Sequence, residues 1–105
     1  MMIELPWPSS ILSPNARPHW GARNRAFSKH KSWAHNATLA HRPALQREPL
    51  PEGELRVVVT AYPPTAHKMD RDNFLSRCKA YLDGISYCLG IDDCRFDPRV
   101  QWGEV

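Results

Sequence analysis

The stretch that decides the fold lies between residues 70 and 93 and reads DRDNFLSRCKAYLDGISYCLGIDD. Its apolar side chains recur at helical spacing and form one stripe. They are Phe74, Leu75, Cys78, Tyr81, Leu82, Ile85 and Leu89. Gly90 follows the last of them, and glycine commonly ends a helix at that position. The pattern predicts one amphipathic helix over residues 72–89.

Carboxylates cluster at both ends of this expected helix. Asp70 and Asp72 stand at its start, and Asp92 and Asp93 follow its end. Crowded carboxylates repel one another unless a positive charge lies between them, and a divalent cation with oxygen ligands is the usual solution. The alternative is that one aspartate caps the helix and a second is favoured by the helix dipole. That alternative explains Asp92 and Asp93 poorly.

The helix raises a geometric objection to a shared metal. A straight helix would separate Asp72 from Asp93 by about 25 to 30 Å. The two can meet only if the chain doubles back after Gly90 or if a second subunit intervenes. Asp72, Ser76, Lys79 and Asp83 form a polar stripe on this helix. For Asp83 we favour the simpler interpretation that it lies on a solvated helix face.

The remaining segments predict a small α+β fold. Residues 2–5 are expected to form a first strand, and residues 7–25 a long ordered loop. Ser28 is expected to cap a helix that ends near Arg42, before Pro43. Residues 55–62 are rich in β-branched side chains and predict a strand. A last strand is expected around residues 100–102. We therefore expect a single domain over residues 1–105, with a mixed sheet of short strands packed by two helices.

Charge is distributed unevenly along the chain. The 105 residues carry a net charge of +3, with a pI near 9.0. Seven basic residues and one acidic residue, Glu4, lie in residues 1–47. A basic first half followed by a cluster of acidic residues fits an enzyme that acts on nucleic acid. Basic side chains would hold the phosphates, and the carboxylates would hold a metal ion. The alternative is that the surplus of arginine only keeps the protein soluble.

The cysteines indicate a reducing environment. Cys78, Cys88 and Cys94 are odd in number and show no C-x-x-C spacing. We expect Cys78 and Cys88 to be buried thiols, which suggests a cytoplasmic protein. No secretory signal or membrane-spanning run is recognised, so no membrane partner is expected.

Other common sites are excluded or weaker. An EF-hand starting at Asp70 fails because its sixth position is Leu75 and its twelfth is Tyr81. No Ser-His-Asp grouping and no phosphate-binding glycine loop is seen. Tryptophan could stack on unpaired bases, although we favour core or dimer packing for each tryptophan except Trp20.

These motifs together resemble the RusA-type Holliday junction resolvases. The likeness rests on residues 5–9 (LPWPS), on Asp70-x-Asp72-Asn73, on Lys79-x-x-x-Asp83 and on residues 90–93 (GIDD). It implies a homodimeric α+β endonuclease that uses Mg²⁺ or Mn²⁺ to nick opposed strands of a four-way DNA junction. Lys79 stands about one helical turn further from Asp72 than in some family members, with Ser76 at the nearer position.

The resemblance also implies roles for individual residues. Asp70, Asp72 and Asp93 would be the acidic metal-binding residues, and Lys79 would neutralise charge on the phosphate. The DNA backbone would be held by basic side chains. Those are Arg17, His19, Arg23, Arg25, Lys68 and Arg71. Two alternatives remain open: a broader nuclease acting on flaps or forks, and a DNA-binding protein without catalysis.

Overall fold

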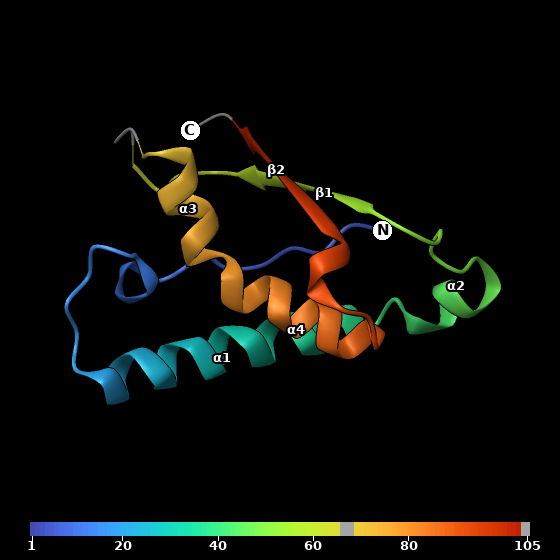
Figure 1. The fold of residues 1–105 in the computed structure, drawn as a ribbon, viewed down its shortest axis with the longest axis horizontal. Coiled ribbons are helices and arrows are strands. Elements are labelled where there is room, and N and C mark those ends of the chain that lie inside the picture. Colours follow the sequence, from blue (N-terminus) through green and yellow to red (C-terminus); the bar gives the residue numbers. More distant parts are fainter. Residues whose placement is uncertain (66–68, 104–105) are drawn as a thin grey trace.

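The computed structural model describes residues 1–65 and 69–103 and shows a small α+β domain (Figure 1). Within that part of the chain there are four α-helices, two strands and two short 3₁₀ helices. In chain order they are η1 (Ser10–Leu12), α1 (Trp20–Leu39), α2 (Arg42–Arg47), β1 (Leu55–Ala61), α3 (Arg71–Arg77), α4 (Lys79–Leu89), η2 (Asp93–Arg95) and β2 (Phe96–Trp102).

The two strands form a parallel sheet. Leu55 pairs with Phe96 and Ala61 with Trp102, so the strands match along their whole length. The chain returns from the end of β1 to the start of β2 through α3 and α4, as a parallel connection requires. The strand expected at residues 55–62 is confirmed, and β2 contains the one expected around residues 100–102. The expectation of a mixed sheet is wrong for the described residues.

Helix α4 lies between the sheet and α1, and α1 packs along it (Figure 1). Gly84 makes this packing close. A Cβ atom at Gly84 would overlap the backbone oxygen of Lys31 and lie 3.0 Å from the Cβ atom of Ala34. Ala34 is fully buried, as is Thr38 one turn later. The α1–α4 contact thus depends on small side chains that let the two backbones approach.

The single helix expected over residues 72–89 is instead two helices that meet at Cys78. Cys78 has a φ of −87° and a ψ of −3°, and this ψ lies well away from the usual α-helical value of about −42°. Its N–H is shared between the carbonyl oxygens of Phe74, at 3.1 Å, and Leu75, at 3.0 Å. Figure 1 shows α3 and α4 at a clear angle. The bend lets α3 pack on β2 while α4 packs on α1.

Aromatic packing ties α3 to the sheet. Phe74 is buried, with its ring centre 5.1 Å from that of Trp7 and 5.4 Å from that of Trp102. Ala61 and Cys78 complete this cluster. Cys78 and Cys88 are buried free thiols, as expected, and Cys94 is exposed.

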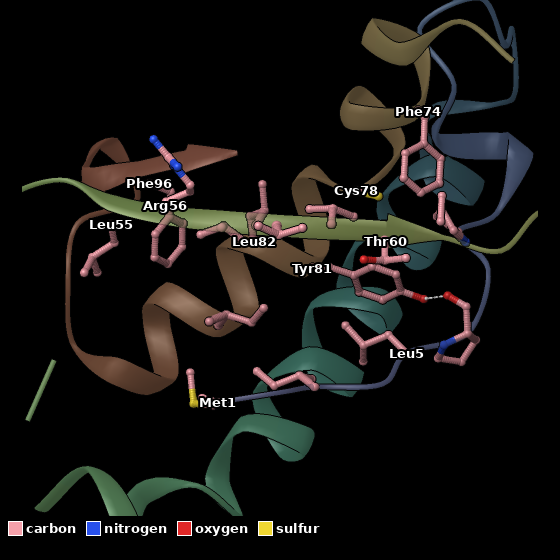
Figure 2. Close-up of a pocket in the computed structure, with 18 of the residues that line it drawn as sticks. Met1, Leu5, Leu55, Arg56, Thr60, Phe74, Cys78, Tyr81, Leu82 and Phe96 are labelled. Atoms are coloured by element: carbon pink, nitrogen blue, oxygen red, sulfur yellow. Dashed lines mark hydrogen bonds between the residues drawn. The ribbon is translucent and has the colours of Figure 1, made fainter. Parts of the chain in front are cut away.

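The strand expected at residues 2–5 is not formed. An apolar pocket of about 430 Å³ lies between residues 1–8 and β1. Figure 2 shows Met1 and Leu5 across this pocket from the strand. The hydroxyl of Tyr81 donates to the carbonyl oxygen of Pro6 at 2.8 Å and holds the segment on the helix side. Ile3 and Leu5 therefore line the pocket, but the backbone of residues 2–5 does not pair with β1.

The first long helix begins earlier than expected. Its N-cap is His19 rather than Ser28, and the His19 Nδ1 atom accepts a hydrogen bond from the Gly21 N–H at 3.1 Å. Residues 20–25 therefore belong to α1 and not to a loop. Helix α1 ends at Leu39, and Pro43 lies in the first turn of α2. Proline at that position fits a helix start, because the missing N–H would have had no partner there.

Candidate active site

A surface hollow of about 260 Å³ gathers several of the predicted site residues, and we call it the acidic hollow. Its polar lining is Ser76 from α3, Lys79 and Asp83 from α4, and Asp93 from η2. Apolar side chains complete its wall. They are Leu75, Leu82, Phe96 and Pro98. The hollow lies where the α3–α4 bend faces the start of β2.

Asp93 reaches this hollow because the chain reverses after α4. Gly90 has a left-handed φ of 69°, and the Ile91 N–H donates to the Ser86 carbonyl oxygen at 3.1 Å. This is a Schellman ending, which glycine adopts without strain. Asp92 then accepts a hydrogen bond from the Cys94 N–H at 2.9 Å, which caps η2 and lowers the pKa of Asp92. The reversal brings Asp93 into the hollow with Asp83 but not to Asp72, so the distance objection to a metal shared by Asp72 and Asp93 still holds within one chain.

Asp83 and Asp93 form a pair of carboxyl groups. Burial raises the pKa of Asp83, and a hydrogen bond with the Asp93 side chain and its charge raise it further. Lys79 and Lys31 oppose part of this rise. Two ionised carboxylates repel each other, so this proximity favours a positive charge or a cation between them. The expectation that Asp83 merely lies on a solvated face overlooked this partner.

Lys79 is exposed and lines the same hollow. Among the described residues, Arg99 and Asp97 form the one ion pair, with 3.0 Å between their N and O atoms. Lys79 and Asp83 are therefore close in sequence and share a hollow without forming a direct ion pair. The Lys79 ammonium group remains available to an incoming anion.

Asp70 and Asp72 lie towards the other end of α3 and do not line the acidic hollow. Asp70 is the N-cap, and its carboxylate accepts a hydrogen bond from the Asn73 N–H at 3.3 Å. Asp72 is exposed in the first turn, four residues before Ser76 and so on the same helix face. Asp72 lies in the first turn of α3, whereas Lys79 begins α4 beyond the bend at Cys78. The capping role foreseen as the alternative for one aspartate is confirmed for Asp70.

No group of three or more His, Cys, Asp or Glu side chains that could hold a metal ion occurs in residues 1–65 and 69–103. Within this single chain, Asp93 therefore meets Asp83 rather than both Asp70 and Asp72.

Asn73 links the acidic motif to the N-terminal segment. Its side-chain amide donates to the Ser13 hydroxyl at 3.1 Å. Arg23 on α1 donates to the carbonyl oxygens of Ile11 and Ser13 at 3.2 and 3.3 Å. The loop after η1 is thus held by both α1 and α3. The sequence motif indicated that Asn73 matters, but nothing in the sequence identified Ser13 as its partner.

The predicted DNA-binding residues occupy different environments. Arg17, Arg25 and Arg71 are exposed, and His19 is an exposed helix cap. The guanidinium group of Arg23 is partly engaged by the two carbonyl oxygens already described. Lys68 lies outside the described residues. A feature that the sequence did not reveal is a groove along α1, where Arg25 lies with Lys29 and Trp33.

Comparison with known proteins finds a relative whose own function is uncharacterized. A protein of Xylella fastidiosa (strain Temecula1), named only as an uncharacterized protein, is 46% identical over 95 residues. The match covers 90% of this chain and 61% of the relative, so the chain spans less than two thirds of the relative's length. No protein-family model matches the chain. No solved structure matches it either. Among the described helices, none has the length and apolar character needed to cross a membrane.

Proposed function

We propose that this protein is a metal-dependent endonuclease of the RusA type that cuts branched DNA, with the four-way junction as its substrate. One observation carries the proposal: the bend at Cys78 and the reversal at Gly90 bring Asp93 to Asp83, with Lys79 beside them in the acidic hollow. Paired carboxylates next to an unpaired lysine match the requirements of phosphodiester hydrolysis. Free thiols fit the cytoplasmic setting of such an enzyme.

The donor atoms of the hollow fit Mg²⁺ or Mn²⁺. Mg²⁺ usually keeps several waters and binds through one or two carboxylates together with substrate phosphate. Asp93 and Asp83 supply two carboxylates, and Ser76 adds a hydroxyl. Of the acidic residues that the resemblance implies, Asp93 lines the hollow and Asp83 joins it there, whereas Asp70 and Asp72 lie outside the hollow and would reach the cation only if a second subunit brought them near. When bound, the cation would activate water and stabilise charge on the phosphate.

The chain's own residues supply orientation and positive charge. Lys79 would hold a nonbridging or leaving oxygen of the scissile phosphate. Arg17, His19, Arg25 and Arg71 would bind neighbouring phosphates without reading sequence, and Lys68 and Arg23 belong to the same proposed set. A homodimer would present two such hollows, as paired nicks on a two-fold junction require.

The test is cleavage of a labelled four-way junction with a fixed crossover, beside a linear duplex of matched length. Wild-type protein should nick opposed junction strands symmetrically with Mg²⁺ and lose this activity in EDTA. Asp93→Asn should reduce the cleavage rate by about 100-fold or more, because it removes a carboxylate that acts on the cation. Glu52→Gln is the matched control, since Glu52 is exposed in the turn before β1.

The other outcomes separate the alternatives. Cutting of flaps and forks at comparable rates would replace the junction-selective enzyme with a broader branched-DNA nuclease. Tight junction binding with no cutting in Mg²⁺ or Mn²⁺ would overturn the enzymatic proposal. Asp70 would then serve mainly as the N-cap of α3, where it accepts a hydrogen bond from the Asn73 N–H.

A further inference from the structure

A second groove runs along one face of α1 and shares no lining residue with the acidic hollow. We call it the α1 groove, and its volume is about 440 Å³. Arg25, Lys29 and Trp33 line it at four-residue intervals, so they lie in one row on the helix. Pro6 and Ile11 of the N-terminal segment line the facing wall. This volume is within the range of about 300 to 1,000 Å³ typical of ligand sites.

The facing wall is held in place before any ligand arrives. Tyr81 on α4 donates to the carbonyl oxygen of Pro6 at 2.8 Å. The Ser9 N–H donates to Nε2 of buried His30 at 3.0 Å, and the other ring nitrogen lies 2.7 Å from the Ala26 carbonyl oxygen. His30 therefore bridges the segment to α1 with both ring nitrogens. A ligand would enter a groove that is already shaped.

The groove combines aromatic and positive groups. Trp33 is half-buried, and its ring centre lies 4.9 Å from that of His30. The Lys29 Nζ atom lies 4.9 Å from the Trp33 ring centre. Helix α1 contains four basic residues, Arg and Lys, and no acidic residue. This charge favours an anionic ligand, and the indole ring that lines the groove favours a flat aromatic one.

An unpaired nucleotide meets both requirements, since it offers a base to stack and a phosphate to bind. We propose that the α1 groove binds an unpaired nucleotide of a DNA strand, with its base stacked on Trp33 and its phosphate held by Arg25 and Lys29. The flexible Lys29 side chain would leave the ring as the base arrives and turn to the phosphate. The identity of the DNA as the open centre of a branched substrate rests on the proposed function, whereas the groove itself does not.

The test measures binding of two fluorescent oligonucleotides of ten residues, oligo(dT) and an abasic strand with the same phosphates, by anisotropy in EDTA. Wild-type protein should bind oligo(dT) at least about 5-fold more tightly, which is the low end of the contribution of one stacked base. Trp33→Leu should abolish this preference, and Trp33→Phe should retain most of it. Tyr87→Leu is the matched control, because Tyr87 is an aromatic residue with 70% exposure outside the groove.

The phosphate contacts have a separate signature. Arg25→Gln and Lys29→Gln should weaken binding of both oligonucleotides by similar factors. Each should also reduce the slope of log affinity against log salt by about 0.7, the value for one phosphate contact on a single strand. An unchanged slope in both variants would contradict the assignment of these side chains to phosphate.

Equal affinity of wild-type protein for the two oligonucleotides would overturn the proposal. If Trp33→Leu does not fold, nuclear magnetic resonance of the wild-type protein tests the site instead, because each tryptophan gives its own indole N–H signal. The Trp33 signal, assigned with Trp33→Phe, should shift with oligo(dT) and not with the abasic strand, and no shift would reject the site. This test measures binding and not cleavage. Its result for the α1 groove is therefore independent of whether the protein proves to be a nuclease.

Discussion

At the scale of single residues, Asp83 and Asp93 line the acidic hollow together, and Asp93 contributes to the raised pKa of Asp83. A raised pKa means that the folded protein binds the Asp83 proton more tightly than the unfolded chain does. Stability contributed by this group therefore falls as pH rises through the interval above the usual aspartate pKa. Above that interval the charge on Asp83 opposes folding. Such local cost is common where a site is built for function.

Asp83→Asn should for this reason increase thermal stability at pH 7 in the absence of metal. The gain should shrink as pH falls through the raised pKa of Asp83, because the wild-type group then becomes neutral too. Melting temperatures measured between pH 4 and pH 8 in EDTA test this. Glu52→Gln serves as the control and should show no comparable trend. A lower melting temperature for Asp83→Asn at pH 7 would contradict the pairing.

A second residue-scale prediction concerns the hydrogen bond between Tyr81 and Pro6. Tyr81→Phe removes one buried hydroxyl without changing shape and should destabilise the protein by about 0.5 to 1.5 kcal/mol. Tyr87→Phe should change stability by less than about 0.5 kcal/mol, because that residue is exposed. Urea unfolding of both variants provides the comparison. Equal effects would show that the Tyr81 hydroxyl does not hold the N-terminal segment.

At the scale of elements, the sequence predicted those helix and strand features that depend on neighbouring residues in the chain. The β-branched run over residues 55–62 predicted β1, and Gly90 predicted the end of α4. The break at Cys78 was not predictable, because the apolar stripe continues through it without interruption. Its cause is long-range: α3 must pack on β2 through Phe74 while α4 packs on α1 through Gly84. The strand predicted at residues 2–5 does not form for a similar reason, since Tyr81 holds this segment away from β1.

Gly84→Ala tests the element-scale packing. Alanine normally favours a helix over glycine by about 1 kcal/mol. Here its methyl group would meet the backbone of Lys31, so we expect a net loss of about 1 to 3 kcal/mol. Gly21→Ala in the first turn of α1 is the control, because its methyl group would meet only side-chain atoms, the nearest at 3.2 Å. Stabilisation by Gly84→Ala would mean that the helices are further apart than described.

At the scale of the whole molecule, the sequence predicted an α+β domain and one half of the candidate site. It placed Lys79 and Asp93 in the site, and the reversal at Gly90 brings them to one hollow. It could not reveal that Asp83 would share the hollow with Asp93, because that proximity depends on the Schellman turn and on η2. It also missed the α1 groove, because part of α1 and most of the facing wall come from residues 7–25, which were expected to form a long loop.

Metal binding should be visible in the stability of the whole domain. A ligand that binds only the folded state raises stability in proportion to the logarithm of its concentration. Mg²⁺ at 100 times its dissociation constant should add about 2.7 kcal/mol to wild-type protein. Asp93→Asn should lose most of this gain, and Asp97→Asn, which disrupts the ion pair with Arg99 on β2, should retain it. Identical gains in both variants would place the cation elsewhere.

The proposed function depends on a divalent cation bound beside Asp93, and paramagnetic Mn²⁺ would locate that cation. Substoichiometric Mn²⁺ would be added to ¹⁵N-labelled wild-type protein, and the loss of each backbone amide signal would be measured. Signals of Ser76, Asp83 and Asp93 should disappear first, with those of Trp20, Gly21 and Arg23 at the far end of α1 retained. Uniform broadening, or earliest loss at the start of α1, would contradict a metal centre in the acidic hollow.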